Sequence, residues 1–146
     1  MTRYDYLKPG TLAEAFGMFA EAGDARFVAG GTDLMVRVRE GEVRTKALVS
    51  LRNVPEIAGI ALDGGCARIG AATPIAEIAG HEGLKARFPV LAQAALRVGG
   101  PAIRNAGTVG GNLCNASPCA DTALPLLVLE AALEVARARG TRRIPR

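Results

Sequence analysis

The chain has 146 residues, 49% of them hydrophobic, so it is long enough to bury one substantial core or two small ones. It contains four phenylalanines, two tyrosines and no tryptophan, which argues against a nucleic-acid surface built on aromatic stacking. The net charge of +4 depends on five arginines within residues 137–146, where no acidic residue accompanies them. Because this charge is confined to one end, we expect a solvated hairpin or tail there, and no nucleic-acid partner.

Three cysteines, Cys66, Cys114 and Cys119, are spaced too irregularly for a disulfide framework or for the paired spacing of a zinc site. We therefore expect reduced thiols in a cytoplasmic protein, and no metal site. No apolar stretch approaches the length of a membrane span. No charged start followed by an apolar segment indicates a secretion signal either.

The first third of the chain alternates strand patterns with helix patterns. Strands are predicted at residues 4–7, 26–29 and 47–51, and helices at 15–20 and 34–39. Thr11 and Glu14 form a capping box before the first helix, and Gly23 supplies its stop. This order predicts a small βαβ-like subdomain over residues 1–54.

The pattern changes near Val54 and Pro55, where a second subdomain is predicted to begin and to extend to residue 146. We expect it to combine antiparallel hairpins with helices. In chain order these are a hairpin of 59–62 with 66–71, a short helix opened by Pro74, a longer one from Pro89 to 96, a buried helix at 123–131, and a hairpin of 133–137 with 142–144. Both prolines are expected in the first helical turn, where a missing N–H costs nothing.

Two glycine-rich segments carry the strongest functional signal. Gly30 and Gly31 follow a predicted strand, and Gly107, Gly110 and Gly111 lie among hydroxyl and amide side chains. Glycine permits positive φ and lets a ligand approach the backbone, so each segment suits a loop whose N–H groups surround an anion. Two such loops, each leading into a helix, can hold one diphosphate between them.

Neither segment has a common nucleotide-binding signature. Gly-x-Gly-x-x-Gly is missing after Val28, and no Gly-Lys-Ser/Thr follows any glycine, so a Rossmann domain and a P-loop are both disfavoured. Taken alone, Gly30 and Gly31 are equally well explained by an ordinary turn. His81, the only histidine, is expected in a connecting loop, and no arrangement of side chains indicates a catalytic triad or a carboxylate pair.

Four segments together resemble the FAD-binding medium subunits of molybdenum hydroxylases, of the xanthine dehydrogenase and carbon monoxide dehydrogenase type. They are Ala-Gly-Gly-Thr-Asp-Leu at 29–34, Ile-Arg-Asn-x-Gly-Thr-Val-Gly-Gly-Asn at 103–112 with Asp121 after it, Ile-Gly-Ala-Ala-Thr at 69–73, and the opening at 6–15. They occur in the family's order and cover essentially the whole chain. Family members continue for further strands and another domain, so this chain resembles roughly the first half of such a subunit.

The resemblance implies an α+β, two-subdomain PCMH-type FAD-binding fold that is C-terminally truncated. It implies that FAD is held mostly by backbone amides of the glycine segments, and by an acid that accepts hydrogen bonds from flavin hydroxyls. The implied cofactor-binding residues are Ala29, Gly30, Gly31, Thr32, Asp33, Thr108, Val109, Gly110, Gly111, Asn112 and Asp121. Asp121 has an alternative as the N-cap of the helix expected from Ala123, and the two roles are compatible.

The same resemblance implies a flavoprotein that serves as an oxidoreductase subunit and is not active alone. Electrons would leave a substrate at a molybdopterin cofactor on a large subunit and cross 2Fe-2S clusters on a small subunit. They would then pass through FAD to NAD, oxygen or a quinone. No catalytic side chain is expected, because the cofactor carries the chemistry. The alternative is a non-catalytic truncated remnant or docking module of such a complex.

Overall fold

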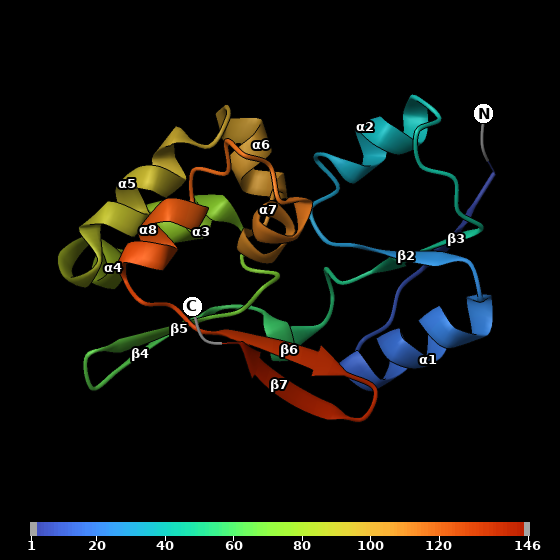
Figure 1. Cartoon of the computed structure of the whole chain (residues 1–146), viewed down its shortest axis with the longest axis horizontal. Helices are drawn as coiled ribbons and strands as arrows, with labels where there is room; N and C mark the ends of the chain where they lie inside the picture. The colour runs from blue at the N-terminus through green and yellow to red at the C-terminus, as the bar shows by residue number, and fades with distance from the viewer. Residues whose placement is uncertain (1–2, 145–146) are drawn as a thin grey trace.

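The computed structural model describes residues 3–144, which form two lobes (Figure 1). The first lobe contains a parallel sheet in the order β1-β3-β2, with β1 at Asp5–Leu7, β3 at Ala47–Ser50 and β2 at Ala25–Val28. Helices α1 (Leu12–Ala22) and α2 (Leu34–Arg39) lie on opposite sides of these strands (Figure 1). Every residue of the central strand β3 is buried, as expected for a parallel strand that is covered on both faces.

Helix α1 begins where the sequence predicts a capping box. The Thr11 hydroxyl accepts a hydrogen bond from the Glu14 backbone N–H at 3.1 Å. The Glu14 carboxylate accepts one from the Gly10 backbone N–H at 2.7 Å, so the box closes one residue before the N-cap. Gly23, with φ of +68°, ends the helix as predicted.

The second lobe places helices beside two hairpins. A short 3-10 helix, η1 (Pro55–Ile57), leads into the first hairpin, which pairs β4 (Ile60–Asp63) with β5 (Cys66–Ile69). The second hairpin pairs β6 (Leu133–Arg137) with β7 (Gly140–Ile144). The helices are α3 (Ile75–Gly80), α4 (Glu82–Arg87), α5 (Pro89–Arg97), α6 (Pro101–Ala106), α7 (Val109–Asn115) and α8 (Ala123–Val128). They gather on one side of the strands (Figure 1). The predicted mixed α+β fold, with a parallel first part and antiparallel hairpins after it, is confirmed.

Each lobe has its own apolar core. In the first lobe Ala15, Ala25 and Ala47 are buried together, and Phe19 stacks on Phe27 with ring centroids 4.4 Å apart. In the second lobe the buried residues come from the helices, and the inner faces of β4 and β5 pack against them; they are Ile75, Ile78, Ala79, Leu84, Leu91, Ala95, Val98 and Val109. Each lobe thus buries its own apolar face, and a few core residues, among them Ala25 and Ile75, also border the space between the lobes.

The sequence missed three short helices. Helices α4 and α6 fall in stretches of six residues, too short for an apolar period to appear. Helix α7 contains Gly110 and Gly111, which we expected in a loop. Pro89 takes the first position of α5 as predicted, whereas Pro74 is the N-cap of α3. His81, expected in a loop, caps α4 by accepting a hydrogen bond from the Leu84 N–H at its Nδ1.

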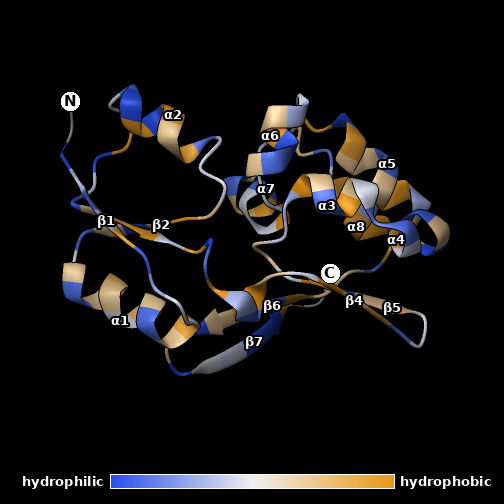
Figure 2. Ribbon diagram, turned by 180° about the vertical axis from the view of Figure 1, so that it is seen from behind, coloured by the Kyte–Doolittle hydropathy of each residue, from blue (hydrophilic) through white to orange (hydrophobic). Residues whose placement is uncertain are grey.

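The helix predicted at 123–131 begins at Ala123 as expected, but the predicted end and the predicted burial are wrong. Helix α8 ends at Val128, and Glu130 follows with a φ of +57°, outside the helical region. One face of α8 packs on the core, but Leu124 and Val128 are 71% and 76% exposed. Figure 2 shows α8 in the hydrophobic colour, in contrast to the polar strand β7. Across residues 3–144, every helix is too short or too polar to cross a membrane.

Candidate functional site

A cavity of about 660 Å³ lies between the two lobes, and both glycine-rich segments line it. We call it the interlobe cavity. Eight of the predicted site residues are in its wall: Ala29, Gly30, Gly31, Thr32, Asp33, Thr108, Gly111 and Asn112. Val109, Gly110 and Asp121 are outside it. The fold thus brings together two segments that are more than seventy residues apart in the chain. The volume of the cavity between them is within the range of small-molecule sites.

The lobes are in tight backbone contact at Gly30. A Cβ atom built there would overlap the Ala106 carbonyl oxygen and lie 2.7 Å from the Gly107 Cα. Both neighbours are backbone atoms, so they cannot move aside by changing a rotamer. Glycine at position 30 is therefore required for the end of β2 to meet the end of α6, and both Gly30 and Gly107 line the interlobe cavity.

Gly31 serves a different purpose, because its φ of +76° turns the chain from β2 towards α2. Within residues 3–144, the backbone N–H groups of Gly30, Gly31, Thr32 and Asp33 have no hydrogen-bond partner. Four consecutive donors next to a cavity can bind the oxygen atoms of an anion. The first segment therefore has the backbone chemistry that the sequence predicts.

The second segment differs, because four of its amides already have partners within the protein. They are Val109 N–H to Thr73 O (3.1 Å), Gly110 N–H to Ala71 O (2.8 Å), Gly111 N–H to Thr108 Oγ1 (3.1 Å) and Asn112 N–H to Thr108 O (2.9 Å). Helix α7 thus uses four amides to attach itself to residues 71–73 and to its own N-cap, whereas the Thr108 N–H has no partner within residues 3–144. The expectation that this segment holds a ligand by its backbone stays a prediction, and Thr108 is the residue that can fulfil it without a change in these hydrogen bonds.

Close packing explains the glycines of the second segment. Gly107 has φ of −67°, and Gly110 and Gly111 are helical, so the expected positive φ does not occur there. A Cβ at Gly110 would lie 2.7 Å from the Ala71 Cβ and carbonyl oxygen. Glycine at 110 thus allows α7 to approach residues 71–73, so here it is the protein and not a ligand that comes close to the backbone.

Side chains supply the polar groups on this wall. The Thr108 hydroxyl caps α7 by accepting the Gly111 N–H, and its own proton stays available. Asn112 accepts a hydrogen bond at Oδ1 from Thr122, which leaves its NH2 group available. The sequence analysis missed Thr122. A threonine at the start of a helix is common, and only its full burial in the fold distinguishes this one.

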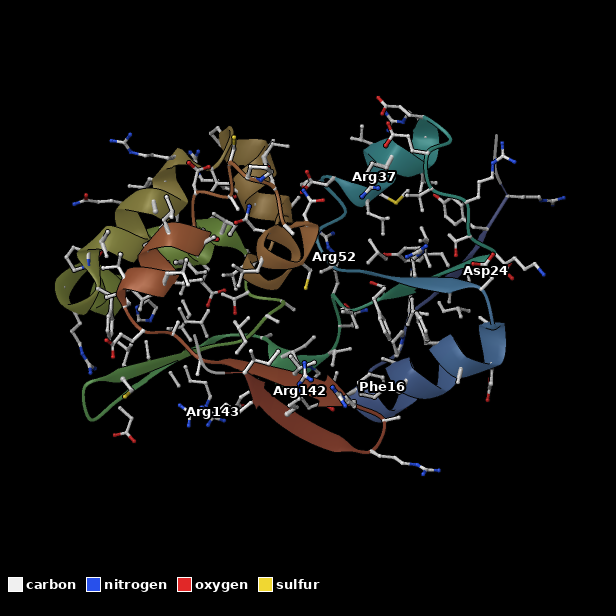
Figure 3. The ribbon with its side chains drawn as sticks, viewed as in Figure 1. Phe16, Asp24, Arg37, Arg52, Arg142 and Arg143 are labelled. Atoms are coloured by element: carbon white, nitrogen blue, oxygen red, sulfur yellow. The ribbon has the colours of Figure 1, made fainter. Side chains whose placement is uncertain are left out.

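Two arginines contribute positive charge to the interlobe cavity. Arg26, on β2, and Arg37, on α2, both line it, and Arg37 also forms an exposed ion pair with Glu42 at 3.5 Å. Figure 3 shows Arg37 on the side of α2 that faces the strands. Neither was predicted, because only the pairing of β2 with β3 and the position of α2 bring them to the cavity. A smaller cavity of about 330 Å³ adjoins, shares Ala29 and Thr108, and is lined by Arg52.

Asp121 is exposed and outside the interlobe cavity wall. The alternative role as N-cap is wrong, because Thr122 occupies that position in α8.

The cysteines Cys66, Cys114 and Cys119 are free and exposed, and Cys114 and Cys119 line the interlobe cavity. Among the described residues, no group of three His, Cys, Asp or Glu side chains could hold a metal ion.

Comparison with known proteins shows the family of the chain. Residues 2–146 match the family model described as "FAD binding domain in molybdopterin dehydrogenase". The xanthine dehydrogenase FAD-binding subunit of Escherichia coli O157:H7 is 37% identical over 141 residues, which is 96% of this chain and 48% of that protein. The nicotinate dehydrogenase FAD-subunit of Eubacterium barkeri is 30% identical over 99% of this chain and 49% of its own length.

Solved structures share the fold of this chain. Carbon monoxide dehydrogenase from Hydrogenophaga pseudoflava superposes with a TM-score of 0.94 at 30% identity, covering 98% of this chain and 50% of the matched one. Quinoline 2-oxidoreductase from Pseudomonas putida 86 gives a TM-score of 0.92 at 30% identity, over 97% of this chain and 50% of that one. The chain spans about half the length of the curated relatives it matches.

Proposed function

Because the chain belongs to the family of FAD-binding domains in molybdopterin dehydrogenases, we propose that it holds FAD in the interlobe cavity. The observation that carries the proposal is the convergence of the two glycine-rich segments on that one cavity. The cavity fits such a ligand, because unpaired amide donors and two arginines face a space large enough for a nucleotide.

Each wall has its own part in this proposal. The N–H groups of residues 30–33 bind the diphosphate oxygens, and Arg26 and Arg37 supply opposite charge. Asn112 and Thr108 donate from the facing wall. Val109 and Gly110 stay in the proposed set because they hold α7 against residues 71–73. Asp121 is proposed to accept hydrogen bonds from flavin hydroxyls at the exposed edge of the site.

The two lobes are proposed to be the subdomains 1–54 and 55–146, joined through the Gly30 contact. The redox chemistry belongs to the bound FAD, which exchanges electrons between 2Fe-2S clusters and NAD, oxygen or a quinone. We place those clusters on a small partner subunit and a molybdopterin cofactor on a large one, as in the heteromeric complexes implied by the family. The residues of this chain bind and orient the flavin; none of them is proposed as an acid, base or nucleophile.

Titration with FAD tests the proposal, followed by the change in flavin absorbance and fluorescence. We expect saturable binding with one FAD per chain, competition by ADP, and weaker binding of riboflavin, which lacks the diphosphate. Absence of FAD binding would show that the cavity is not the flavin site.

The second candidate is a docking module without a cofactor. It is favoured by one observation, the uncovered apolar residues Leu124, Leu127 and Val128 on α8. A chain that binds no FAD but joins a complex with the proposed large or small subunit would support this candidate over the first.

A further inference from the structure

We propose that Thr122 is a positioning residue for the flavin site, one that fixes the Asn112 carboxamide so that its NH2 group faces the interlobe cavity. The inference rests on the proposed function, because it assigns the NH2 group to a hydrogen-bond acceptor on the ligand. Thr122 itself is outside the cavity wall, so any effect it has on a ligand must pass through Asn112.

The contact between the two side chains is specific. The Thr122 hydroxyl is fully buried and donates to Asn112 Oδ1 at 2.5 Å, across ten residues of chain and from one short helix to the next. Asn112 is half-buried and lines the cavity. The bond therefore joins the start of α8 to the middle of α7 at the point where α7 forms the wall.

Thr122 gives up the usual role of a threonine at its position. It is the N-cap residue of α8, yet its side chain makes no capping hydrogen bond. By contrast, Thr11 and Thr108 both cap their helices through Oγ1. A threonine at an N-cap normally accepts from a backbone N–H two or three residues later. Here the hydroxyl points to Asn112 instead, and departures from local rules of this kind concentrate at functional sites.

The direction of the hydrogen bond determines which group of the Asn112 side chain is available to a ligand in the cavity. Asn112 Oδ1 accepts the proton of Thr122, so the two donors of its NH2 group are left for other partners. If the carboxamide turned over, the buried Thr122 hydroxyl would lose its acceptor, and an unsatisfied buried polar group is unfavourable. The wall at Asn112 is thereby set as a donor, and it selects ligand oxygen atoms such as those of a phosphate, a ribityl chain or a flavin carbonyl.

The test compares FAD affinity in Thr122→Val, which loses the hydroxyl but keeps the shape, with Thr122→Ser, which keeps the hydroxyl. We expect Thr122→Val to weaken FAD binding about tenfold and Thr122→Ser to bind within about twofold of wild type. In an Asn112→Ala background, Thr122→Val should have no further effect. Thr45→Val is the matched control, because Thr45 is also buried and its hydroxyl bonds only the backbone of the first lobe.

Wild-type affinity in Thr122→Val, or equal losses in Thr122→Val and Thr45→Val, would overturn the positioning role. A second readout does not need a flavin, namely the NMR signals of the Asn112 side-chain amide. They should shift in Thr122→Val and return in Thr122→Ser; signals unchanged in Thr122→Val would also overturn the inference. If the wild-type chain fails to bind FAD while these signals behave as expected, the proposed function is wrong and the positioning of Asn112 stands.

Discussion

The Gly30 contact gives the sharpest prediction. In Gly30→Ala, the new Cβ would overlap the Ala106 carbonyl oxygen and lie 2.7 Å from the Gly107 Cα, whereas carbon atoms in contact prefer about 3.5–4.0 Å. Since both neighbours are backbone, relief requires the lobes to separate by roughly 1 Å. Overpacking of this kind costs about 1–3 kcal/mol.

The same displacement widens the interlobe cavity, because Gly30 and Gly107 lie on its two sides and both line it. A loss of about 1.4 kcal/mol in binding free energy is tenfold in affinity, so we expect FAD affinity to fall by about 10- to 100-fold. Urea unfolding and FAD titration measure the two effects separately. The matched control is Gly17→Ala in α1, where an added Cβ meets no atom within 4 Å and should stabilise the chain by up to about 1 kcal/mol. A Gly30→Ala chain with wild-type stability and FAD affinity would refute the reasoning.

Gly31→Ala should destabilise the chain by about 1–2 kcal/mol in urea unfolding, because its φ of +76° strains any residue with a Cβ; an unchanged midpoint would contradict this. Thr11→Ala should cost about 1 kcal/mol by removing the cap of α1, and should leave FAD affinity unchanged. Saturating FAD should slow alkylation of Cys114 and Cys119, measured by mass spectrometry, while Cys66 in the β4–β5 hairpin reacts as before. Equal protection of all three thiols, or of none, would place the ligand elsewhere.

Local signals account for the elements that the sequence predicted well. The capping residue Thr11, the stop at Gly23 and the helix-opening Pro89 act on their own neighbours, so their effect can be predicted without knowledge of the fold. The predicted helix at 34–39 agrees residue for residue with α2. The errors fall where local signals are weak or misleading, as at α7, where the glycines suggested a loop.

The same distinction between local signals and long-range contacts applies to the candidate site. The sequence identified both glycine segments and the family, because those depend on residue types in a fixed order along the chain. It could not show that Gly110 faces Ala71, or that the amides of Val109 and Gly110 are already used by residues 71–73. Those facts depend on a contact across more than thirty residues, which no propensity of the segment itself reports.

By itself, the sequence determined the order of the strands and of the longer helices, the caps at Thr11 and Gly23, and membership of a flavin-binding family, because each is carried by neighbouring residues. The tertiary structure alone decided which donors face the interlobe cavity. Packing and capping of α7 use the N–H groups of residues 109–112, whereas those of residues 30–33 have no partner within residues 3–144. Burial of Thr122 against Asn112 then replaces lost backbone donors with a side-chain amide. A hydrogen-bonding group can serve a ligand only if the fold has not already satisfied it, and that depends on the whole structure.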